Sequence, residues 1–308
     1  MAEEHYEIRD ERFAKLIHVN ADVEILWSGG RWTEGPAYFP AGRYLIWSDI
    51  PNDRLLRWDE TSGAVSVFEQ GCLNQNGHTV DRMGRLICCE HRGRAVTRRE
   101  FDGSRTVLAS HFEGKRLNSP NDVVEKSDGS IWFTDPTYGI DSEYEGDAAE
   151  GQIGGSFVYR IDPDGTVDRV VTDMVQPNGL AFSPDERILY VADTGRTHRP
   201  DCKPVIRAYP LQDGGKKVGA GSEFATCEAG LFDGFRVDTN GNIWSSAGDG
   251  VPCFAPDGTL IGKIRTPRVV SNVCFRGPTR NRLFICATTM LLSVFVNARG
   301  CGLKGKRS

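Results

Sequence analysis

One pattern recurs six times along the chain: a polar residue, a small residue, an apolar stretch, a turn and a second apolar stretch. The copies begin at Glu34, Asn76, Asn121, Asn178, Asp233 and Ser271. Their turns contain pairs such as Asp-Gly and Asn-Gly, which tolerate positive φ, and their apolar stretches are rich in Val, Ile, Phe, Trp and Tyr. Both features are typical of a β-hairpin, so the chain repeats one hairpin six times.

Two further strand-like stretches follow the hairpins, as RLLRWDE and AVSVFEQ do after the first copy. A four-stranded unit that repeats at this spacing is typical of a propeller blade. We therefore predict an all-β fold, a six-bladed β-propeller with four-stranded blades, as a single domain over 1–308 with an N-terminal extension at 1–20. The segment 22–28 is expected to supply the outer strand of the last blade. Two β-sandwiches would not explain six equivalent hairpins.

The first residue of every copy carries a side-chain oxygen. It opens the strand that lines the axis of a propeller, so these six side chains should converge at one mouth of the channel. Glu34 and Asp233 would repel each other there unless a cation compensated them. Hard divalent ions take carboxylate and amide oxygens, whereas structural zinc sites use Cys and His. The ring predicts one divalent metal ion; the alternative is that these residues only cap strand starts.

The second strand of the hairpin returns to the same mouth and ends in an acidic residue in the first four copies. Asp49, Glu90 and Asp193 are expected to cap turns around the ring. Asp135 precedes the long insertion 138–155, and we expect it to contact a ligand or a second ion. Long insertions in a propeller usually shape a pocket on one face.

Histidines near the ring are candidates for proton transfer. His78 follows Asn76 by two residues and should point to the same side of a regular strand, as a proton shuttle or as a packed histidine. His91, His111 and His198 fall in predicted loops, where we expect solvated side chains. No Gly-x-Ser-x-Gly elbow, phosphate loop or dinucleotide fingerprint is present, which disfavours a serine hydrolase or a nucleotide-binding enzyme.

The overall charge and hydropathy limit the classes of partner that the protein is expected to bind. The formal net charge of −5 and the pI of about 5.8 disfavour nucleic acid. No apolar run approaches the roughly 20 residues that span a bilayer, and the charged N-terminus has no apolar signal segment. We therefore expect a cytoplasmic protein without membrane contact. The nine cysteines show no zinc-site spacing and are expected to be reduced, mostly buried thiols.

Several short motifs resemble the SMP-30/gluconolactonase/luciferin-regenerating-enzyme (LRE) family. The likeness runs from about Glu24 to Phe295, and Cys89-Glu90-His91 places it nearest the bacterial gluconolactonase branch. The order and spacing of the motifs together carry the resemblance. They are Glu34-Gly35-Pro36, Ser119-Pro120-Asn121-Asp122, Trp132-Phe133-Thr134-Asp135-Pro136, Pro177-Asn178-Gly179 and Phe232-Asp233-Gly234.

The resemblance implies a six-bladed propeller with one catalytic divalent ion held by Glu34, Asn178 and Asp233. It also implies that Asn121 contacts the substrate or the water on the ion. The animal branch has an arginine two residues before that asparagine, used on sugar lactones, where this chain has Ser119. Arg116 is a nearby candidate for that role. We add four substrate-binding candidates: Asn76, His78, Arg116 and Asp135.

These observations lead us to expect a divalent-metal-dependent lactonase, a carboxylic ester hydrolase that opens a sugar-type or related small lactone. The metal would polarise the carbonyl and activate water, Asp233 would act as general base, and Asn121 would donate to the oxyanion. We expect Ca²⁺, with Zn²⁺, Mg²⁺, Mn²⁺ or Fe²⁺ as alternatives. The alternative functions are a metal-dependent esterase or phosphotriesterase in the same site and a non-catalytic binding propeller. The oligomeric state, the particular lactone and the role of 138–155 stay open.

Overall fold

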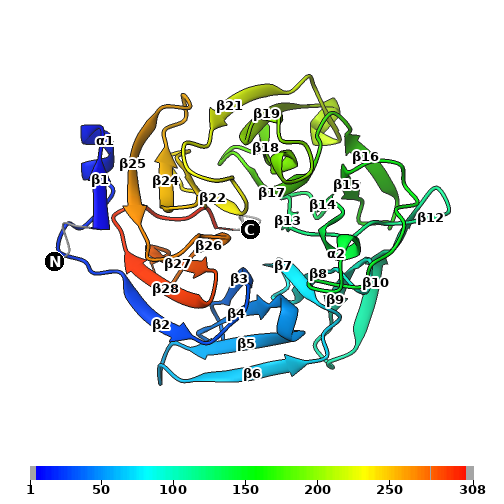
Figure 1. Cartoon of the computed structure of the whole chain (residues 1–308), viewed down its shortest axis with the longest axis horizontal. Coiled ribbons are helices and arrows are strands. Elements are labelled where there is room, and N and C mark those ends of the chain that lie inside the picture. Colours follow the sequence, from blue (N-terminus) through cyan, green and yellow to red (C-terminus); the bar gives the residue numbers. More distant parts are fainter. Residues whose placement is uncertain (1–4, 278, 303–308) are drawn as a thin grey trace.

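The computed structural model describes residues 5–277 and 279–302 and places six antiparallel sheets in a ring around one axis (Figure 1). Each sheet contains one of the six predicted hairpins as its two inner strands. The predicted six-bladed propeller with four-stranded blades is therefore confirmed. Among the described residues, no helix has the length and apolar character needed to span a bilayer.

Blades 1 to 4 are each built from a continuous stretch of chain whose strands run from the axis outward. The strands of blades 1 and 2 are Thr33–Phe39 (β3), Tyr44–Asp49 (β4), Arg54–Asp59 (β5), Val65–Gln70 (β6), Gln75–Val80 (β7), Leu86–Glu90 (β8), Ala95–Arg99 (β9) and Arg105–Ala109 (β10). Those of blades 3 and 4 are Val123–Glu125 (β13), Ile131–Asp135 (β14), Phe157–Ile161 (β15), Val167–Val171 (β16), Pro177–Phe182 (β17), Ile188–Asp193 (β18), Val205–Gln212 (β19) and Ser222–Thr226 (β21).

Blades 5 and 6 each receive a strand from the N-terminal part of the chain. Their own strands are Phe235–Val237 (β22), Ile243–Ser245 (β23), Gly250–Phe254 (β24), Leu260–Arg265 (β25), Asn272–Arg276 (β26), Arg282–Ala287 (β27) and Met290–Phe295 (β28). Tyr6–Ile8 (β1) pairs with β25 as a fifth strand, and Glu24–Ser28 (β2) pairs with β28 as the fourth strand of blade 6. The expected closure by segment 22–28 is therefore confirmed.

The remaining elements are short. The α-helices are Glu11–Ala14 (α1) and Tyr138–Asp141 (α2), and the 3₁₀ turns are Ile50–Asn52 (η2), Gly195–Thr197 (η3) and Asp213–Gly215 (η4). Three two-residue strands lie outside the four-stranded pattern: His111–Phe112 (β11), Lys115–Arg116 (β12) and Lys217–Val218 (β20). The helix α2 opens the predicted insertion 138–155, which therefore has structure of its own.

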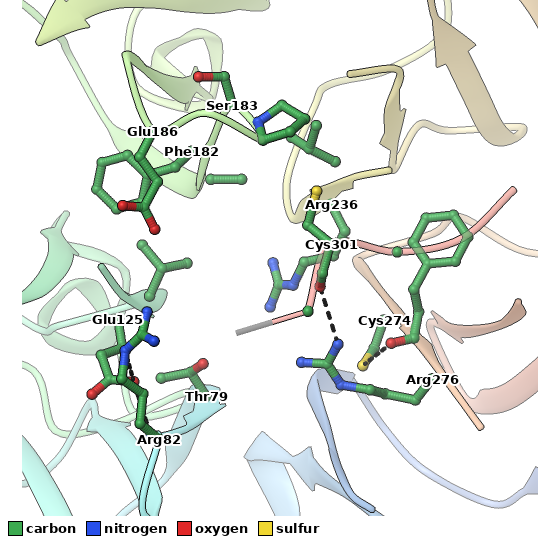
Figure 2. A pocket seen from close by; sticks show the side chains of 17 residues that line it. Thr79, Arg82, Glu125, Phe182, Ser183, Glu186, Arg236, Cys274, Arg276 and Cys301 are labelled. Carbon is green, nitrogen blue, oxygen red and sulfur yellow. Dashed lines mark hydrogen bonds and ion pairs between the residues drawn. The ribbon is translucent and has the colours of Figure 1, made fainter. Parts of the chain in front are cut away.

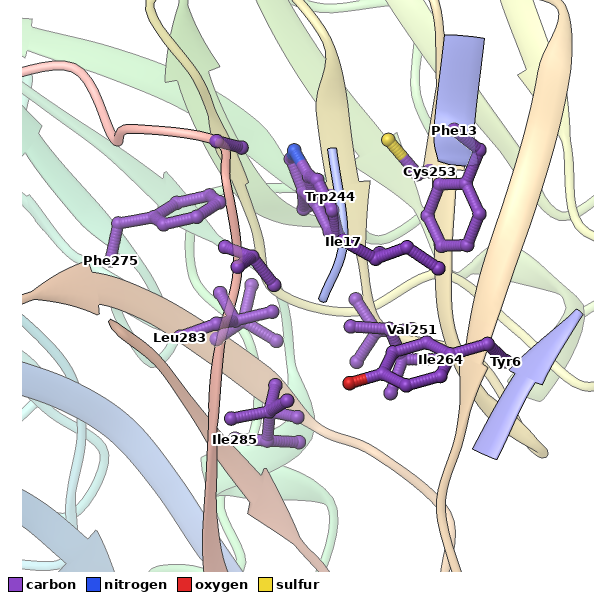
Figure 3. Close-up of a cluster of buried hydrophobic side chains, with 14 of the residues drawn as sticks. Tyr6, Phe13, Ile17, Trp244, Val251, Cys253, Ile264, Phe275, Leu283 and Ile285 are labelled. Carbon is purple, nitrogen blue, oxygen red and sulfur yellow. The ribbon is translucent and has the colours of Figure 1, made fainter. Parts of the chain in front are cut away.

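The N-terminal extension packs on the ring as part of its core. Phe13 of α1 is fully buried, and its ring centroid lies 5.8 Å from that of Trp244 in blade 5. A Cβ at Gly262 would come within 2.1 Å of the Phe13 ring, so β25 needs glycine there. Figure 3 shows this cluster, which joins the extension to the apolar side chains between blades 5 and 6. Residues 1–4 of the predicted extension lie outside the described residues.

Glycine follows the polar residue in four of the six copies because the innermost strands nearly touch at the axis. A Cβ on Gly35 would lie 2.0 Å from the carbonyl oxygen of Asn76, and one on Gly179 would lie 2.2 Å from that of Asp233. Real Cβ atoms do not approach backbone so closely, so only glycine fits these positions. The small residue of the repeat thus allows each polar residue to lie next to its counterpart in the following blade.

Candidate active site

Five of the six polar residues that open the copies line one cavity of about 320 Å³, at the end of the channel where the innermost strands begin. We call this end the ring mouth. This volume is sufficient for a small ligand. The five are Glu34, Asn76, Asn121, Asn178 and Asp233. The remaining wall is mainly apolar and includes Trp32, Leu231, Val269 and Val270.

The sixth copy does not contribute its first residue. The Ser271 hydroxyl donates to the carbonyl oxygen of Thr33 at 2.6 Å and is fully buried outside the cavity. The next residue, Asn272, donates instead from Nδ2 to Oε2 of Glu34 at 2.9 Å. The prediction that all six residues converge is therefore correct for five and wrong for Ser271. Its hydroxyl serves the backbone between blades 6 and 1.

Glu34 is a buried carboxylate with only part of its hydrogen-bonding capacity used. Its Oε2 accepts from the backbone N–H of Gly35 at 2.6 Å and from Asn272, whereas no donor to Oε1 is found among the described residues. Burial raises the pKa of Glu34, and the nearby Asp122 and Glu145 raise it further. A carboxyl in this position favours either a proton or a cation.

Asp233 is a second carboxyl that lines the same cavity and is partly exposed to it. Burial raises the pKa of Asp233 well above its usual range, and the charges of Glu34 and Glu145 raise it further. Its backbone N–H donates to the Ser246 hydroxyl at 2.7 Å, which fixes the start of the strand. Two acids that raise each other's pKa in one enclosed cavity need a compensating positive charge to be ionised together.

The side-chain amides of Asn76 and Asn178 line the same cavity. Nδ2 of Asn178 lies 3.4 Å from the hydroxyl of Thr194, and Nδ2 of Asn76 lies 3.1 Å from Nε2 of His91. The Asn76 nitrogen is engaged by His91, which leaves its carbonyl oxygen for the cavity, whereas the Asn178 amide also forms a hydrogen bond with the Asp233 carboxyl. Within the described residues, no cluster of three or more His, Cys, Asp and Glu side chains is suited to a metal. The donors here are carboxylates mixed with amides, which fit a hard cation such as Ca²⁺ or Mg²⁺.

The other predicted substrate-binding residues lie outside the cavity. His78 is buried, with Nδ1 2.8 Å from the carbonyl oxygen of Gly35 and Nε2 3.2 Å from Oε1 of Gln75. The pairing of β7 with β8 shifts register between Gln75 and His78, and this bulge breaks the alternation that would have placed His78 beside Asn76. Arg116 is exposed on β12, where its guanidinium lies 3.3 Å from the carbonyl oxygen of Gly93.

Asp135 is fully buried and accepts the backbone N–H of Asn118 at 2.9 Å. This burial raises the pKa of Asp135 to about 7. Asp49 and Asp193 act in the same way, since each accepts the backbone N–H groups that precede an innermost strand. These acids therefore hold the chain that leads into the ring, as expected for Asp49 and Asp193. The insertion places Asp135 beneath the chain and away from the cavity.

Two residues that the sequence did not point to belong to this region. His91 is completely buried, contrary to the expectation of a solvated loop, because the insertion 138–155 covers it. Burial lowers the pKa of His91 to about 4, so its ring is neutral near pH 7. Glu145 of the insertion lines the cavity itself. The motif Cys-Glu-His contains His91, but nothing in its spacing indicates the long-range contact.

The opposite end of the channel, where the innermost strands finish, has a different cavity of about 140 Å³ (Figure 2). We call this end the far mouth. Its charged lining residues are Arg82, Glu125, Glu186, Arg236 and Arg276. Most of these charges have partners: Arg82 lies 3.7 Å from Glu125, and Arg276 donates to the carbonyl oxygen of Cys301. The cavity is smaller than most ligand sites.

The fold and the ring mouth define a propeller with one enclosed, oxygen-rich site on its axis. Residues 32–289 match the SMP-30/Gluconolactonase/LRE-like region. The chain therefore belongs to the SMP-30/gluconolactonase/LRE-like family. The resemblance seen in its motifs is confirmed.

Three relatives illustrate the similarity. The gluconolactonase of Zymomonas mobilis is 32% identical, over 92% of this chain and 83% of its own length. The pentonolactonase XacC of Haloferax volcanii is also 32% identical, over 83% and 81% of the two chains. A solved gluconolactonase structure from Xanthomonas campestris superposes with a TM-score of 0.88 at 40% identity, covering 94% of each chain.

Proposed function

We propose that this protein is a sugar lactonase that depends on one divalent metal ion at the ring mouth. It is a hydrolase of cyclic esters, in keeping with its gluconolactonase and pentonolactonase relatives. The observation that carries the proposal is the meeting of Glu34, Asn178 and Asp233 in one cavity. The same three residues are the metal ligands that the family motifs imply. A scaffold without a ligand would gain nothing from two mutually repelling buried acids.

The ion, when bound by Glu34, Asn178 and Asp233, would supply Lewis acidity toward the lactone carbonyl and lower the pKa of a water molecule. Asp233 accepts the proton of the attacking water, because its carboxylate lines the same cavity as the other proposed metal ligands. Asn121 donates a hydrogen bond to the oxygen that becomes negative when water adds to the acyl carbon. The acyl C–O bond then breaks, and the ring oxygen takes up the proton to give a hydroxy acid.

The cavity wall supports this reaction by limiting solvent. Trp32, Leu231 and Val270 surround the charged floor with apolar surface. A low local dielectric strengthens the interaction of Asn121 and Asp233 with the reacting atoms. The amide of Asn76 provides an acceptor oxygen for a hydroxyl group of the substrate.

The test is a metal-replacement assay. The protein is treated with a chelator, and proton release from a panel of sugar and aliphatic lactones is followed after Ca²⁺, Mg²⁺, Mn²⁺, Zn²⁺ or Fe²⁺ is restored. We expect activity to disappear with the metal and to return with one of the ions. Ser271→Ala is the matched control for substitutions of Glu34, Asn178 or Asp233, because Ser271 occupies the equivalent repeat position but lies outside the cavity. No lactone turnover with any ion would exclude this function, and phosphotriesters would be assayed next.

A further inference from the structure

The insertion 138–155 brings a third carboxylate to the ring mouth. Glu145 lines the cavity, its side chain is 23% exposed, and among the described residues no hydrogen-bond donor to its carboxylate is found. Its nearest cationic candidate is His91, with Nδ1 at 3.8 Å from Oε2. Since His91 is neutral near pH 7, this contact does not neutralise the acid. Burial and the charge of Asp141 raise the pKa of Glu145 to about 7, so a ligand that donates hydrogen bonds to this carboxyl would favour its ionised form.

The position of Glu145 is fixed by the fold of the insertion. A Cβ on Gly146 would lie 2.1 Å from the carbonyl oxygen of Gly139, so only glycine allows the chain to turn back over α2 here. The backbone N–H of Ala149 donates to the carbonyl oxygen of Ile140 at 3.0 Å and closes the turn. Glu145 therefore faces the cavity from an ordered loop and not from a loose end.

A buried histidine connects this loop to the ring. Nδ1 of His91 donates to the carbonyl oxygen of Glu145 at 3.2 Å, which leaves Nε2 to accept from Nδ2 of Asn76 at 3.1 Å. The same neutral imidazole thus holds the backbone of Glu145 and turns the oxygen of Asn76 toward the cavity. One contact fixes the backbone that carries the Glu145 side chain, and the other orients the amide of Asn76.

Neither Ser119, which occupies the position of the animal branch's arginine, nor the nearby candidate Arg116 reaches the cavity. The hydroxyl of Ser119 donates to the carbonyl oxygen of Pro136 at 2.7 Å and accepts from the backbone N–H of Gly139 at 3.0 Å, so it anchors the insertion. Arg116 lies outside the cavity. Apart from Glu34 and Asp233, Glu145 is the charged side chain that lines this cavity within the part of the chain described. The rest of the lining is apolar or carries neutral amides and hydroxyls.

We propose that Glu145 determines specificity for hydroxylated lactones by accepting hydrogen bonds from hydroxyl groups of the substrate. The inference rests on the proposed lactonase function and names the group that selects the substrate. Hydroxyl groups donate strongly to carboxylates, whereas a lactone without hydroxyls leaves this carboxylate unpaired and partly desolvated. Sites built to pair with a hydroxyl discriminate strongly against analogues that lack it. The apolar wall with Trp32 suits the C–H face of the same sugar ring.

The test compares two lactones of equal ring size, D-glucono-δ-lactone and δ-valerolactone, with the metal-loaded wild type and Glu145→Gln. The substitution keeps the shape and removes the charge. We expect the ratio of kcat/KM for the hydroxylated over the plain lactone to fall about 10- to 100-fold, as for loss of one or two hydrogen bonds to a charged group. Glu145→Asp, which keeps the charge on a shorter side chain, should give an intermediate ratio. Glu150→Gln is the matched control, an exposed acid of the same insertion.

Metal content is measured on the same samples. An unchanged ratio in Glu145→Gln overturns the inference, because Glu145 would then not contribute to substrate specificity. An equal loss of kcat/KM on both lactones also overturns it, because Glu145 would then act on the reacting centre. Loss of the metal from Glu145→Gln also overturns it, since Glu145 would be a metal ligand. Wild-type protein that opens neither lactone overturns the proposed function itself, and the inference with it. A selective loss with the metal retained supports both.

Discussion

The two ends of the channel are built from the same six strands but differ in whether their acidic side chains are paired with cationic ones. At the far mouth, acids and arginines occur together, and Glu125 accepts the backbone N–H of Arg82 at 2.9 Å besides facing its guanidinium. At the ring mouth, Glu34, Asp233 and Glu145 share a cavity whose lining contains no lysine or arginine, as far as the chain is described. Stability alone favours the first arrangement. The second is retained only where a ligand supplies the missing positive charge or donors.

The largest effect expected from this comparison is on turnover. Asp233→Asn should lower kcat by about 10²–10⁴, because it would remove the proposed general base and metal ligand while keeping the volume. Glu125→Gln also removes a buried carboxylate, but at the far mouth, and should leave kcat unchanged. Steady-state kinetics with metal analysis of both variants checks this. Equal losses in the two variants would mean that the ends of the channel do not differ in function.

The second effect concerns stability toward heat. A ligand that binds only the folded protein at 100 times its Kd adds about 2.7 kcal/mol to the free energy of unfolding. Restoring the correct ion to chelated protein should therefore raise Tm by about 3 to 5 °C, because the unfolding entropy grows with chain length. Glu34→Gln should lose this shift, and Glu125→Gln should keep it. Calorimetry without any ion-dependent change in the wild type would contradict a metal at the ring mouth.

The third effect is a pH dependence at the far mouth. Burial raises the pKa of Glu125 from its usual value of 4.5 to about 7 in spite of Arg82. The stabilisation from neutral Glu125 is therefore complete below about 4.5 and disappears as the pH rises through about 7. Glu125→Gln is always neutral, so its Tm relative to wild type should increase between these pH values. A Tm difference that stays constant from pH 4 to 8 would show that Glu125 does not titrate in this range.

The smallest effect is expected from Arg276→Ala. The guanidinium of Arg276 donates to the carbonyl oxygen of Cys301 at 3.4 Å, a long contact at the edge of the far mouth. Its loss should reduce the free energy of unfolding by about 0.5–1.5 kcal/mol and leave kcat/KM and the metal-induced shift unaffected. Denaturant unfolding measures the first and lactone kinetics the second. A large loss of activity would show that the far mouth communicates with the site.

The repeat made most of the fold predictable, because six hairpins with the same turn chemistry specify six blades. It also placed Glu34, Asn178 and Asp233 together, since equivalent positions in a ring must meet at the axis. The prediction from the repeat was wrong for Ser271, which does not line the cavity. The Ser271 hydroxyl is bonded to the carbonyl oxygens of Thr33 and Cys286, and a repeat pattern does not show which of its polar residues will serve the backbone in this way.

The contributions of the insertion could not be predicted from the repeat. His91 looked like a loop histidine because its burial depends on residues more than fifty positions away. Glu145 lies in a segment with no periodic pattern, and its direction is set by the contact between Gly139 and Gly146. His78 shows the converse error, because strand alternation was assumed across a bulge. Local patterns predict strands well, but they do not predict which loops fold onto one another.

The pairing of β2 with β28 has a consequence for biosynthesis. Glu24 is made among the first residues, yet its partner Ser293 emerges near the end of translation. The first-made strand must therefore wait for the last blade, and the ring cannot close on the ribosome before nearly the whole chain has appeared. Until then, the oxygens contributed by different blades are held apart. A nascent or truncated chain should thus neither bind the proposed metal nor show activity. The enzyme should become active only after the whole chain has been synthesised.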